Sequence, residues 1–263
     1  MGVWSKKQEM EMKALRWASE MEAKYPSDIS LSANMSMIYG SPFDVALTEG
    51  QPTTIAVVDK DSVSAALDEA NGSEYKIKPC ILNFASYRNP GGKFIEGSSA
   101  QEEMLCHESY LYNVLEKFDK TYYGPHRGKG ATNRALYHNE AIHTPNVTFI
   151  HNGIEFKCDV LTCAAPNYAA AHRYFGVEPL ENAQALKDRI LFIRKIMEVN
   201  NVQTAILGAF GCGVFGQDPN IVAQYFNDIF SKSNIPTIVY AVPKGLNERN
   251  YNVFKRRIAE TGV

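Results

Sequence analysis

The chain has 263 residues, of which 45% are hydrophobic and 21% are charged, and its formal net charge is −2. This composition is typical of a globular protein that is large enough to bury a core without disulfide or metal support. The small net charge argues against a general nucleic-acid-binding protein, because such proteins work by neutralising many phosphates.

The cysteines and the N-terminus favour a cytoplasmic protein. Five cysteines are an odd number with no CxxC pair, so we expect reduced structural thiols. The N-terminus is charged, and no apolar run is long enough for a membrane span, so we expect neither a signal peptide nor a membrane helix. No HExxH motif or other metal-ligand spacing occurs, and we expect neither a metal nor a cofactor.

The first half of the chain predicts a helix followed by strand–helix units. Ser5 and Gln8 form a possible capping box in front of an amphipathic helix that ends before Pro26. Further along, Asp61 is expected to cap a helix. A later helix is expected to begin at Gln101 and to continue to residue 118, because its apolar residues lie on one helix face. The predicted elements are a helix over 6–25, an irregular stretch over 26–50, a strand over 53–58, a helix over 62–70, a strand over 78–84 and a helix over 101–118.

The second half of the chain continues the alternation of strands and helices. A basic, glycine-rich loop over 124–132 is consistent with phosphate contact or with a solvated loop. Asp218 followed by Pro219 predicts a helix start. This alternation predicts an α/β fold with a mostly parallel sheet that is covered on both faces. The predicted elements are strands over 135–142, 147–151 and 159–164, a helix over 182–199, a strand over 204–207, a helix from 219, a strand over 237–242 and a helix over 247–260.

Two glycine-rich stretches each follow a predicted strand and precede a predicted helix, which is where ligands bind in parallel sheets. The first, 83–103, is opened by the glycine pair Gly91 and Gly92 and ends in Glu102 and Glu103. The second, 208–218, contains four glycines. Glycine lets backbone N–H groups turn toward an anion, and a following helix adds its positive end. The pattern therefore indicates phosphate binding beside acid–base chemistry. Tight packing turns, and acids that favour a first helical turn, are the structural alternatives.

Together these stretches resemble the bacterial-type poly(ADP-ribose) glycohydrolases, which have a macrodomain-like fold. The segment Asn89-Pro-Gly-Gly-Lys, with Ala-Gln-Glu-Glu103 after it, resembles the signature of that family. The segment Gly211-Cys-Gly-Val-Phe-Gly-Gln-Asp-Pro219 resembles the second phosphate-binding loop of macrodomains. The resemblance implies a three-layer α/β/α fold with a mixed, mostly parallel sheet. It also implies an N-terminal helical extension, 1–50, packed on a catalytic core, 51–263, in a single domain overall.

The resemblance also implies roles for individual residues. Glu103 is expected to be the catalytic acid and base, and Glu102 to anchor the ribose hydroxyls. Phe215 is expected to place its ring over the distal ribose. The implied substrate-binding residues are Asn89, Gly91, Gly92, Lys93, Gln101, Gly211, Cys212, Gly213, Val214 and Phe215.

Two positions depart from the family pattern. Lys93 stands where the signature has a third glycine, and Gln217 stands where an asparagine is usual. A lysine at the first position requires a negative φ and brings a Cβ toward the pyrophosphate. Alternatively, it supplies a positive charge to that pyrophosphate.

The resemblance implies hydrolysis of ribose–ribose O-glycosidic bonds in poly(ADP-ribose), with release of ADP-ribose. Such a reaction needs a proton for the leaving oxygen and a base for water. Two other functions remain open: an ADP-ribose-binding macrodomain that has lost activity, and a hydrolase of another ADP-ribosyl conjugate. The expected partners are ADP-ribose, poly(ADP-ribose) or an ADP-ribosylated protein, without direct nucleic-acid binding and without a membrane.

Overall fold

The computed structural model describes residues 5–72, 78–128, 130–245 and 248–259. The α-helices are α1 (Lys6–Lys24), α2 (Pro26–Met35), α3 (Ser62–Gly72), α4 (Gln101–His107), α5 (Leu111–Glu116), α6 (Gly124–His126), α7 (Tyr168–Phe175), α8 (Pro179–Val199), α9 (Pro219–Phe230) and α10 (Arg249–Ala259). The strands are β1 (Met37–Tyr39), β2 (Thr54–Val58), β3 (Cys80–Phe84), β4 (Ala141–His151), β5 (Ile154–Cys163), β6 (Thr204–Leu207) and β7 (Thr237–Ala241). Shorter elements are the 3-10 helices η1 (Phe94–Glu96) and η3 (Asn133–Ala135) and the π-helix η2 (Asp119–Tyr123).

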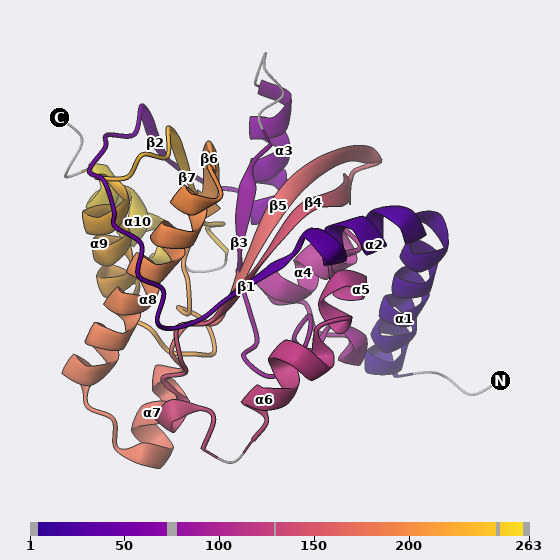
Figure 1. Ribbon diagram of the computed structural model, residues 1–263, viewed down its shortest axis with the longest axis horizontal. Helices are drawn as coiled ribbons and strands as arrows, with labels where there is room; N and C mark the ends of the chain where they lie inside the picture. The colour runs from indigo at the N-terminus through magenta and orange to yellow at the C-terminus, as the bar shows by residue number, and fades with distance from the viewer. Residues whose placement is uncertain (1–4, 73–77, 129, 246–247, 260–263) are drawn as a thin grey trace.

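The strands form one seven-stranded sheet in the order β1-β4-β5-β3-β6-β7-β2 (Figure 1). The pairs β5–β3, β3–β6, β6–β7 and β7–β2 are parallel, whereas β4 pairs antiparallel with both β1 and β5. The prediction of a mixed, mostly parallel sheet is therefore confirmed. Because β3 and β6 are parallel neighbours, the two glycine-rich loops that follow them leave the sheet at the same edge.

Helices cover both faces of the sheet, as predicted (Figure 1). On one face, side chains of α8, α9 and α10 join the strands in a core that includes Ile193, Phe226 and Phe254. On the other face, α1, α3, α4 and α5 contribute to a second core that includes Leu105 and Leu111. This gives three layers, with the sheet in the middle.

Most predicted elements are present within a few residues. Ser5 and Gln8 form the capping box at the start of α1, and Asp61 accepts hydrogen bonds from the backbone N–H groups of Val63 and Ser64. Pro219 begins α9, and Asp218 caps it. The predicted final helix is present as α10, although residues 247 and 260 lie outside the described part of the chain.

Several predictions of secondary structure were wrong. Residues 26–50 are not irregular throughout, because they contain α2 and β1. The predicted strand over 135–142 begins only at Ala141 and continues past 147 as one strand, β4. Helix α7 was not predicted at all.

The helix predicted over 101–118 is broken at Glu108. Its backbone oxygen accepts a hydrogen bond from the N–H of Ile150 at 2.7 Å, and its carboxylate lies 2.6 Å from Nδ1 of His151. Ser109 forms a bridge with Phe149. These contacts with β4, which is distant in sequence, coincide with the end of α4, and α5 begins at Leu111.

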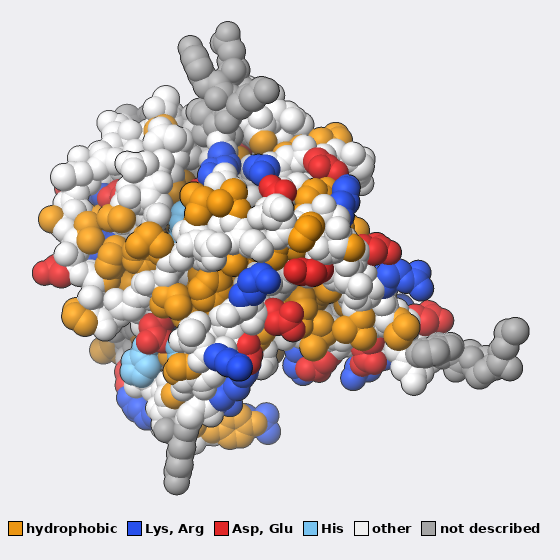
Figure 2. Space-filling model, turned by 45° about the vertical axis from the view of Figure 1, so that its right-hand side comes forward, with side chains coloured by type: hydrophobic (Ala, Val, Ile, Leu, Met, Phe, Trp, Pro, Cys, Tyr) orange, Lys and Arg blue, Asp and Glu red, His pale blue; other side chains and the backbone are white. Residues whose placement is uncertain are grey.

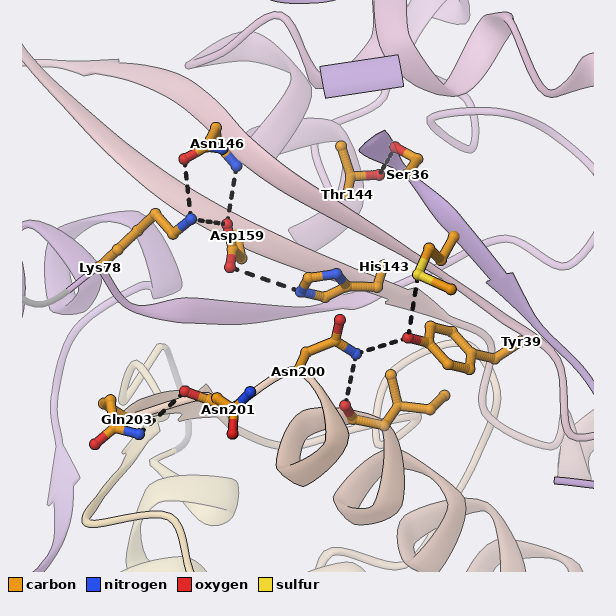
Figure 3. A network of polar contacts seen from close by, with 12 residues as sticks. Ser36, Tyr39, Lys78, His143, Thr144, Asn146, Asp159, Asn200, Asn201 and Gln203 are labelled. Carbon is orange, nitrogen blue, oxygen red and sulfur yellow. Dashed lines mark hydrogen bonds and ion pairs between the residues drawn. The ribbon is translucent and has the colours of Figure 1, made fainter. Parts of the chain in front are cut away.

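A polar network holds a bulge in β4 at the end of β3 opposite the glycine-rich loops (Figure 3). Asn146 has a left-handed φ of +61°, and its backbone N–H donates to Asp159 at 2.8 Å. Lys78 Nζ lies 2.7 Å from the same carboxylate and donates to the Asn146 side chain at 2.9 Å. His143 Nε2 lies 3.7 Å from the second Asp159 oxygen. Burial lowers the pKa of His143, while the charge of Asp159 opposes this shift.

The N-terminal helices pack directly against the segment that carries the paired glutamates. Trp17 Nε1 donates to the backbone oxygen of Ser109 at 2.9 Å, and Asn113 Nδ2 donates to a backbone oxygen of α1 at 2.9 Å. A Cβ on Gly97 would lie 2.7 Å from Cβ of Met10, so η1 and α1 are in close contact. In the view of Figure 2, hydrophobic side chains gather across the middle of the visible face, with charged side chains among and around them.

The helices in the described ranges are all too short or too polar to cross a membrane.

Candidate active site

The loop after β3 is built around two left-handed glycines. The φ angles of Gly91 and Gly92 are +63° and +62°, which other residues adopt with strain. The hydrogen bond from Gly92 N to Asn89 O, at 3.1 Å, closes the turn. The side chain of Ser86 accepts from the backbone N–H of Asn89 at 3.2 Å. The loop therefore returns sharply toward the start of α4.

Glu102 is buried, and both of its carboxylate oxygens are bound by the fold. Oε1 accepts from Asn83 Nδ2 at 3.2 Å, and Oε2 accepts from the backbone N–H of Ser86 at 2.7 Å. Burial raises the pKa of Glu102 to about 8, opposed by these two hydrogen bonds and assisted by the charge of Glu103. Glu102 therefore exchanges a proton near neutral pH.

Glu103 is also buried, at 6% exposure, but only one of its oxygens has a protein partner in the described part of the chain. Oε1 accepts from the backbone N–H of Lys93 at 2.9 Å, whereas Oε2 has none. A Cβ on Gly92 would lie 2.5 Å from Glu103 Oε1 and 2.7 Å from Glu102 Oε2. The glycine is therefore required by the two carboxylates as well as by its φ.

Lys93 fits the loop without strain. Its φ is −111°, so the third position of the signature does not need glycine in this chain. The ammonium group lies 3.8 Å from Glu96, and the side chain is 66% exposed. The backbone N–H of Lys93 donates a hydrogen bond to Glu103, while its charged side chain is exposed at the rim of the loop.

Gln101 acts as a bridge between α4 and the sheet. Its Oε1 accepts from Phe84 N at 2.8 Å, and its Nε2 donates to Leu82 O at 3.0 Å and to Ser62 Oγ at 3.1 Å. These bonds occupy both amide N–H groups. Gln101 therefore fixes the first turn of α4, and with it the two glutamates.

The second loop, after β6, is folded against α8. Gly211 has a φ of +73°, and a Cβ there would lie 2.8 Å from Ala165. Gln217 is buried and exchanges two hydrogen bonds of 2.9 Å with Asn182, and it donates to Pro166 O at 2.7 Å. The second departure from the family pattern thus has a structural role here, because the longer amide reaches α8.

The outer part of this loop is open. Gly213 has no atom within 4 Å of the position where a Cβ would lie, and Val214 is 90% exposed. The absence of packing around Gly213 means that the fold itself does not require a glycine there. The Phe215 ring is half-buried, and its centroid lies 6.1 Å from that of Tyr137. Burial raises the pKa of Cys212 to about 12, so its thiol is a poor nucleophile.

A mainly apolar cavity of about 320 Å³ lies between the two loops and the ends of β3 and β7. It is bounded by segments that are far apart in sequence. Its lining includes Ser62, Phe84, Met104, Ala209, Val242 and Asn250. Since Gln101 and Leu105 also line it, the cavity borders the first turns of α4, which carry the glutamates. It can hold a flat, mostly apolar group.

The described residues contain no cluster of three or more histidine, cysteine or acidic side chains suited to a metal ion.

Sequence reasoning missed several parts of this site. It gave no role to Asn83, although an asparagine between Leu82 and Phe84 in an apolar strand is a buried polar group that needs a partner. Tyr137 was placed in a predicted strand. The cavity was not predicted, since its lining comes from segments that only the fold brings together.

Comparison with known proteins gives concordant results. A family model described as the microbial-type PARG catalytic domain matches residues 8–152. The chain is similar to the structure of poly(ADP-ribose) glycohydrolase (PARG) from Thermomonospora curvata, with 24% identity, a TM-score of 0.81, and coverage of 95% of this chain and 99% of that chain. A Thermomonospora curvata structure bound to the inhibitor ADP-HPD has 24% identity and a TM-score of 0.80, with the same coverage.

A PARG T267R mutant from Deinococcus radiodurans in complex with ADP-ribose has 23% identity and a TM-score of 0.81, with coverage of 91% of this chain and 100% of that chain. These structural similarities confirm the predicted macrodomain-like fold. The search of curated proteins found no match.

Proposed function

The chain belongs to the family of microbial-type PARG catalytic domains, which are glycohydrolases, and we propose that it hydrolyses the ribose–ribose O-glycosidic bonds of poly(ADP-ribose) and releases ADP-ribose. The observation that carries this proposal is the difference between the two glutamates. Both oxygens of Glu102 are bound by the fold, whereas Oε2 of Glu103 is free of protein partners in the described part of the chain. Glu103 is therefore the carboxyl group with a buried oxygen that lacks a protein partner, and we propose that bound substrate supplies that partner.

We assign both proton transfers of the reaction to Glu103. Its carboxyl group donates a proton to the leaving ribose oxygen as the bond from the anomeric carbon to that oxygen breaks. The resulting carboxylate then takes a proton from a water molecule, whose oxygen bonds to the same carbon. The N–H of Lys93 holds Oε1 throughout, which leaves Oε2 to carry the proton.

Glu102 orients the substrate rather than reacting. Its carboxyl group is fixed by Asn83 and Ser86, and its raised pKa leaves much of it protonated near neutral pH. A carboxyl in this state both donates and accepts hydrogen bonds, which suits ribose hydroxyl groups. It also limits the repulsion between two adjacent acids.

The remaining parts of the site match the remaining parts of ADP-ribose. We assign the diphosphate to the backbone of Gly91 and Gly92 together with 211–215, because the open position at Gly213 permits close approach of a ligand. We assign the adenine to the apolar cavity beside α4. Asn89 and Phe215 are proposed to contact the distal ribose.

We also propose that 1–50 and 51–263 work as one domain. The hydrogen bonds of α1 to Asn113 and Ser109, and its close contact with Gly97, support this proposal, because they connect α1 to both ends of α4.

The test is the release of ADP-ribose from purified poly(ADP-ribose). Glu103→Gln is expected to lower kcat by roughly a hundredfold to ten-thousandfold, the usual contribution of general acid–base catalysis. Glu96→Gln is the matched control, since Glu96 lies in the same loop with an exposed side chain. It is expected to retain wild-type activity.

Two results would contradict the proposal. If wild-type protein binds ADP-ribose but releases none from polymer or from any conjugate, the chain is a binding module. If it cleaves only single ADP-ribosyl groups from proteins, it is a hydrolase of another conjugate.

A further inference from the structure

Four non-glycine residues before β4 adopt left-handed backbone conformations. The φ angles are +45° at Asn133, +53° at Arg134, +66° at Ala135 and +60° at Tyr137. Asparagine tolerates this region, but a large aromatic residue adopts it only when its surroundings impose it. Such strain is concentrated at functional sites, which raises the question of what Tyr137 does.

A buried arginine binds the residues on either side of Tyr137. Arg189 is 1% exposed, and its Nη1 donates to Ala164 O. Its Nη2 donates to Leu136 O at 3.4 Å, and its Nε donates to the Asn139 side chain at 2.7 Å. The guanidinium group thus binds both the strained segment and the end of β5. This buried cation therefore fixes the strained segment against the end of β5.

The result is a fixed aromatic stack that ends at Tyr137. The Tyr137 ring is stacked on that of Tyr87, with centroids 4.3 Å apart and planes at 11°. Tyr87 is stacked in turn on His126 at 3.9 Å. The Tyr87 hydroxyl donates to Glu140 at 3.1 Å, and His126 bonds to the same carboxylate. Tyr137 therefore has little freedom to move.

Tyr137 contacts aromatic residues of both loops. Phe215, from the second loop, has its ring centroid 6.1 Å away. Tyr87 follows Ser86, whose backbone N–H holds Glu102. The apolar cavity is lined instead by residues such as Ser62, Ala100 and Pro243. Tyr137 therefore lies outside the lining of the cavity assigned to adenine.

The charge around Tyr137 also suits a nucleotide. Burial raises the pKa of Tyr137, while a hydrogen bond with Asn167 and the charges of Arg88 and Arg189 oppose this shift. Arg88 is exposed, so its cation is available to an anion. An aromatic ring beside an accessible arginine is a common way to bind a base or sugar with its phosphate.

We propose that Tyr137 binds the leaving part of the polymer, namely the ribose and purine of the unit that stays on the chain, while its neighbour Phe215 contacts the distal ribose of the released unit. This inference rests on the proposed function. A released ADP-ribose whose adenine fills the apolar cavity has its distal ribose at the glutamates. The next unit must then continue past Glu103, and we assign it to Tyr137 and Arg88, which are not part of the lining of that cavity.

The test compares binding of polymer and of ADP-ribose, using proteins that carry Glu103→Gln so that the polymer is not cut. Tyr137→Asn removes the ring and suits the left-handed φ. We expect it to weaken the Kd for poly(ADP-ribose) about tenfold, within the range that base stacking contributes. We expect the Kd for ADP-ribose to change less than twofold, since ADP-ribose lacks the leaving unit.

Two further variants sharpen the comparison. Tyr174→Asn is the matched control, because Tyr174 is 68% exposed on α7, and it is expected to leave both Kd values unchanged. Tyr137→His keeps an aromatic ring at a residue type that tolerates this φ. It is expected to retain polymer binding within about threefold of wild type, since histidine also stacks on bases.

The inference is overturned if Tyr137→Asn weakens both ligands equally, or neither, or if Tyr137→His binds polymer as poorly as Tyr137→Asn. If Tyr137→Asn does not fold, the polymer-to-ADP-ribose ratio of Tyr137→His decides alone: loss of polymer binding with folded protein refutes the stacking role. These binding results do not depend on turnover. Failure of wild-type protein to release ADP-ribose would therefore refute the proposed function separately.

Discussion

The burial of Glu102 is expected to destabilise the folded protein as the pH rises. Its pKa is raised from the ordinary 4.5 to about 8 in the folded state, mainly because burial disfavours the charged form. A carboxyl whose folded pKa lies above its unfolded pKa binds its proton more tightly in the folded state. The associated stability is complete below the unfolded pKa and is lost as the pH rises through the window from 4.5 to about 8.

The magnitude follows from the width of that window. Over each pH unit in which Glu102 is ionised in the unfolded state but protonated in the folded state, the free energy of unfolding falls by about 1.4 kcal/mol. Between pH 5 and pH 8 the loss is about 3 kcal/mol, a large share of the stability of a typical domain. Glu102→Gln removes this loss, because an amide does not titrate.

The variant is also expected to pack well. The amide oxygen accepts the Ser86 N–H in place of Glu102 Oε2. The amide nitrogen donates to the Asn83 side-chain oxygen after rotation of that carboxamide, and this oxygen has no protein partner within the described ranges in the wild type. We therefore expect Glu102→Gln to be more stable than wild type at pH 8 and nearly equal to it at pH 5. Its activity is expected to fall, since its ribose contacts change.

The assay is equilibrium unfolding in urea at pH 5, 6, 7 and 8, with Glu96→Gln as the control. Glu96 has an exposed side chain, so its variant should follow the wild-type dependence on pH. The reasoning is refuted if the difference in unfolding free energy between Glu102→Gln and wild type is the same at pH 5 and pH 8.

Three other predictions concern the loop and the opposite end of the sheet. Gly92→Ala is expected to abolish ADP-ribose release, because its Cβ would lie 2.5 Å from Glu103 Oε1 in a left-handed conformation; activity above a tenth of wild type would contradict this. Lys93→Gly is expected to preserve kcat, because the backbone N–H that holds Glu103 remains, and a hundredfold fall in kcat would show that the side chain takes part in the reaction. Burial lowers the pKa of His143 below that of the unfolded chain, so this residue contributes stability above pH ~6.5 that is lost as the pH falls. His143→Gln should therefore lose less stability than wild type between pH 7 and pH 5 in thermal melts, and an unchanged loss would refute the role of His143.

Much of the site is encoded locally and was predictable from the chain alone. Glycine pairs and a following helix start are short-range signals, so the loops at 83–103 and 208–218 were correctly placed after strands. The α1 capping box is equally local, because Ser5 and Gln8 are three residues apart. The alternation of strands and helices then determined a mostly parallel sheet, which places both loops at one edge.

Only the tertiary structure shows the physical difference between the two glutamates, to which the family resemblance alone had given different roles. Asn83 and Ser86 bind both oxygens of Glu102, whereas one oxygen of Glu103 has no protein partner in the described part of the chain. Gln101 was expected to contact the substrate. In the structure its side-chain amide is hydrogen-bonded to the backbone of β3 and to Ser62. These outcomes depend on partners many positions away.

The same reason explains the errors in secondary structure. The apolar pattern after Gln101 favours one long helix, but Glu108 is bound by Ile150 and His151, and these contacts end the helix. The left-handed backbone at Tyr137 is accompanied by hydrogen bonds from Arg189 of α8 to Leu136 O and Asn139, which local periodicity does not show. Local periodicity thus determined which segments form the site, while long-range hydrogen bonds and burial decided which atoms are free to react.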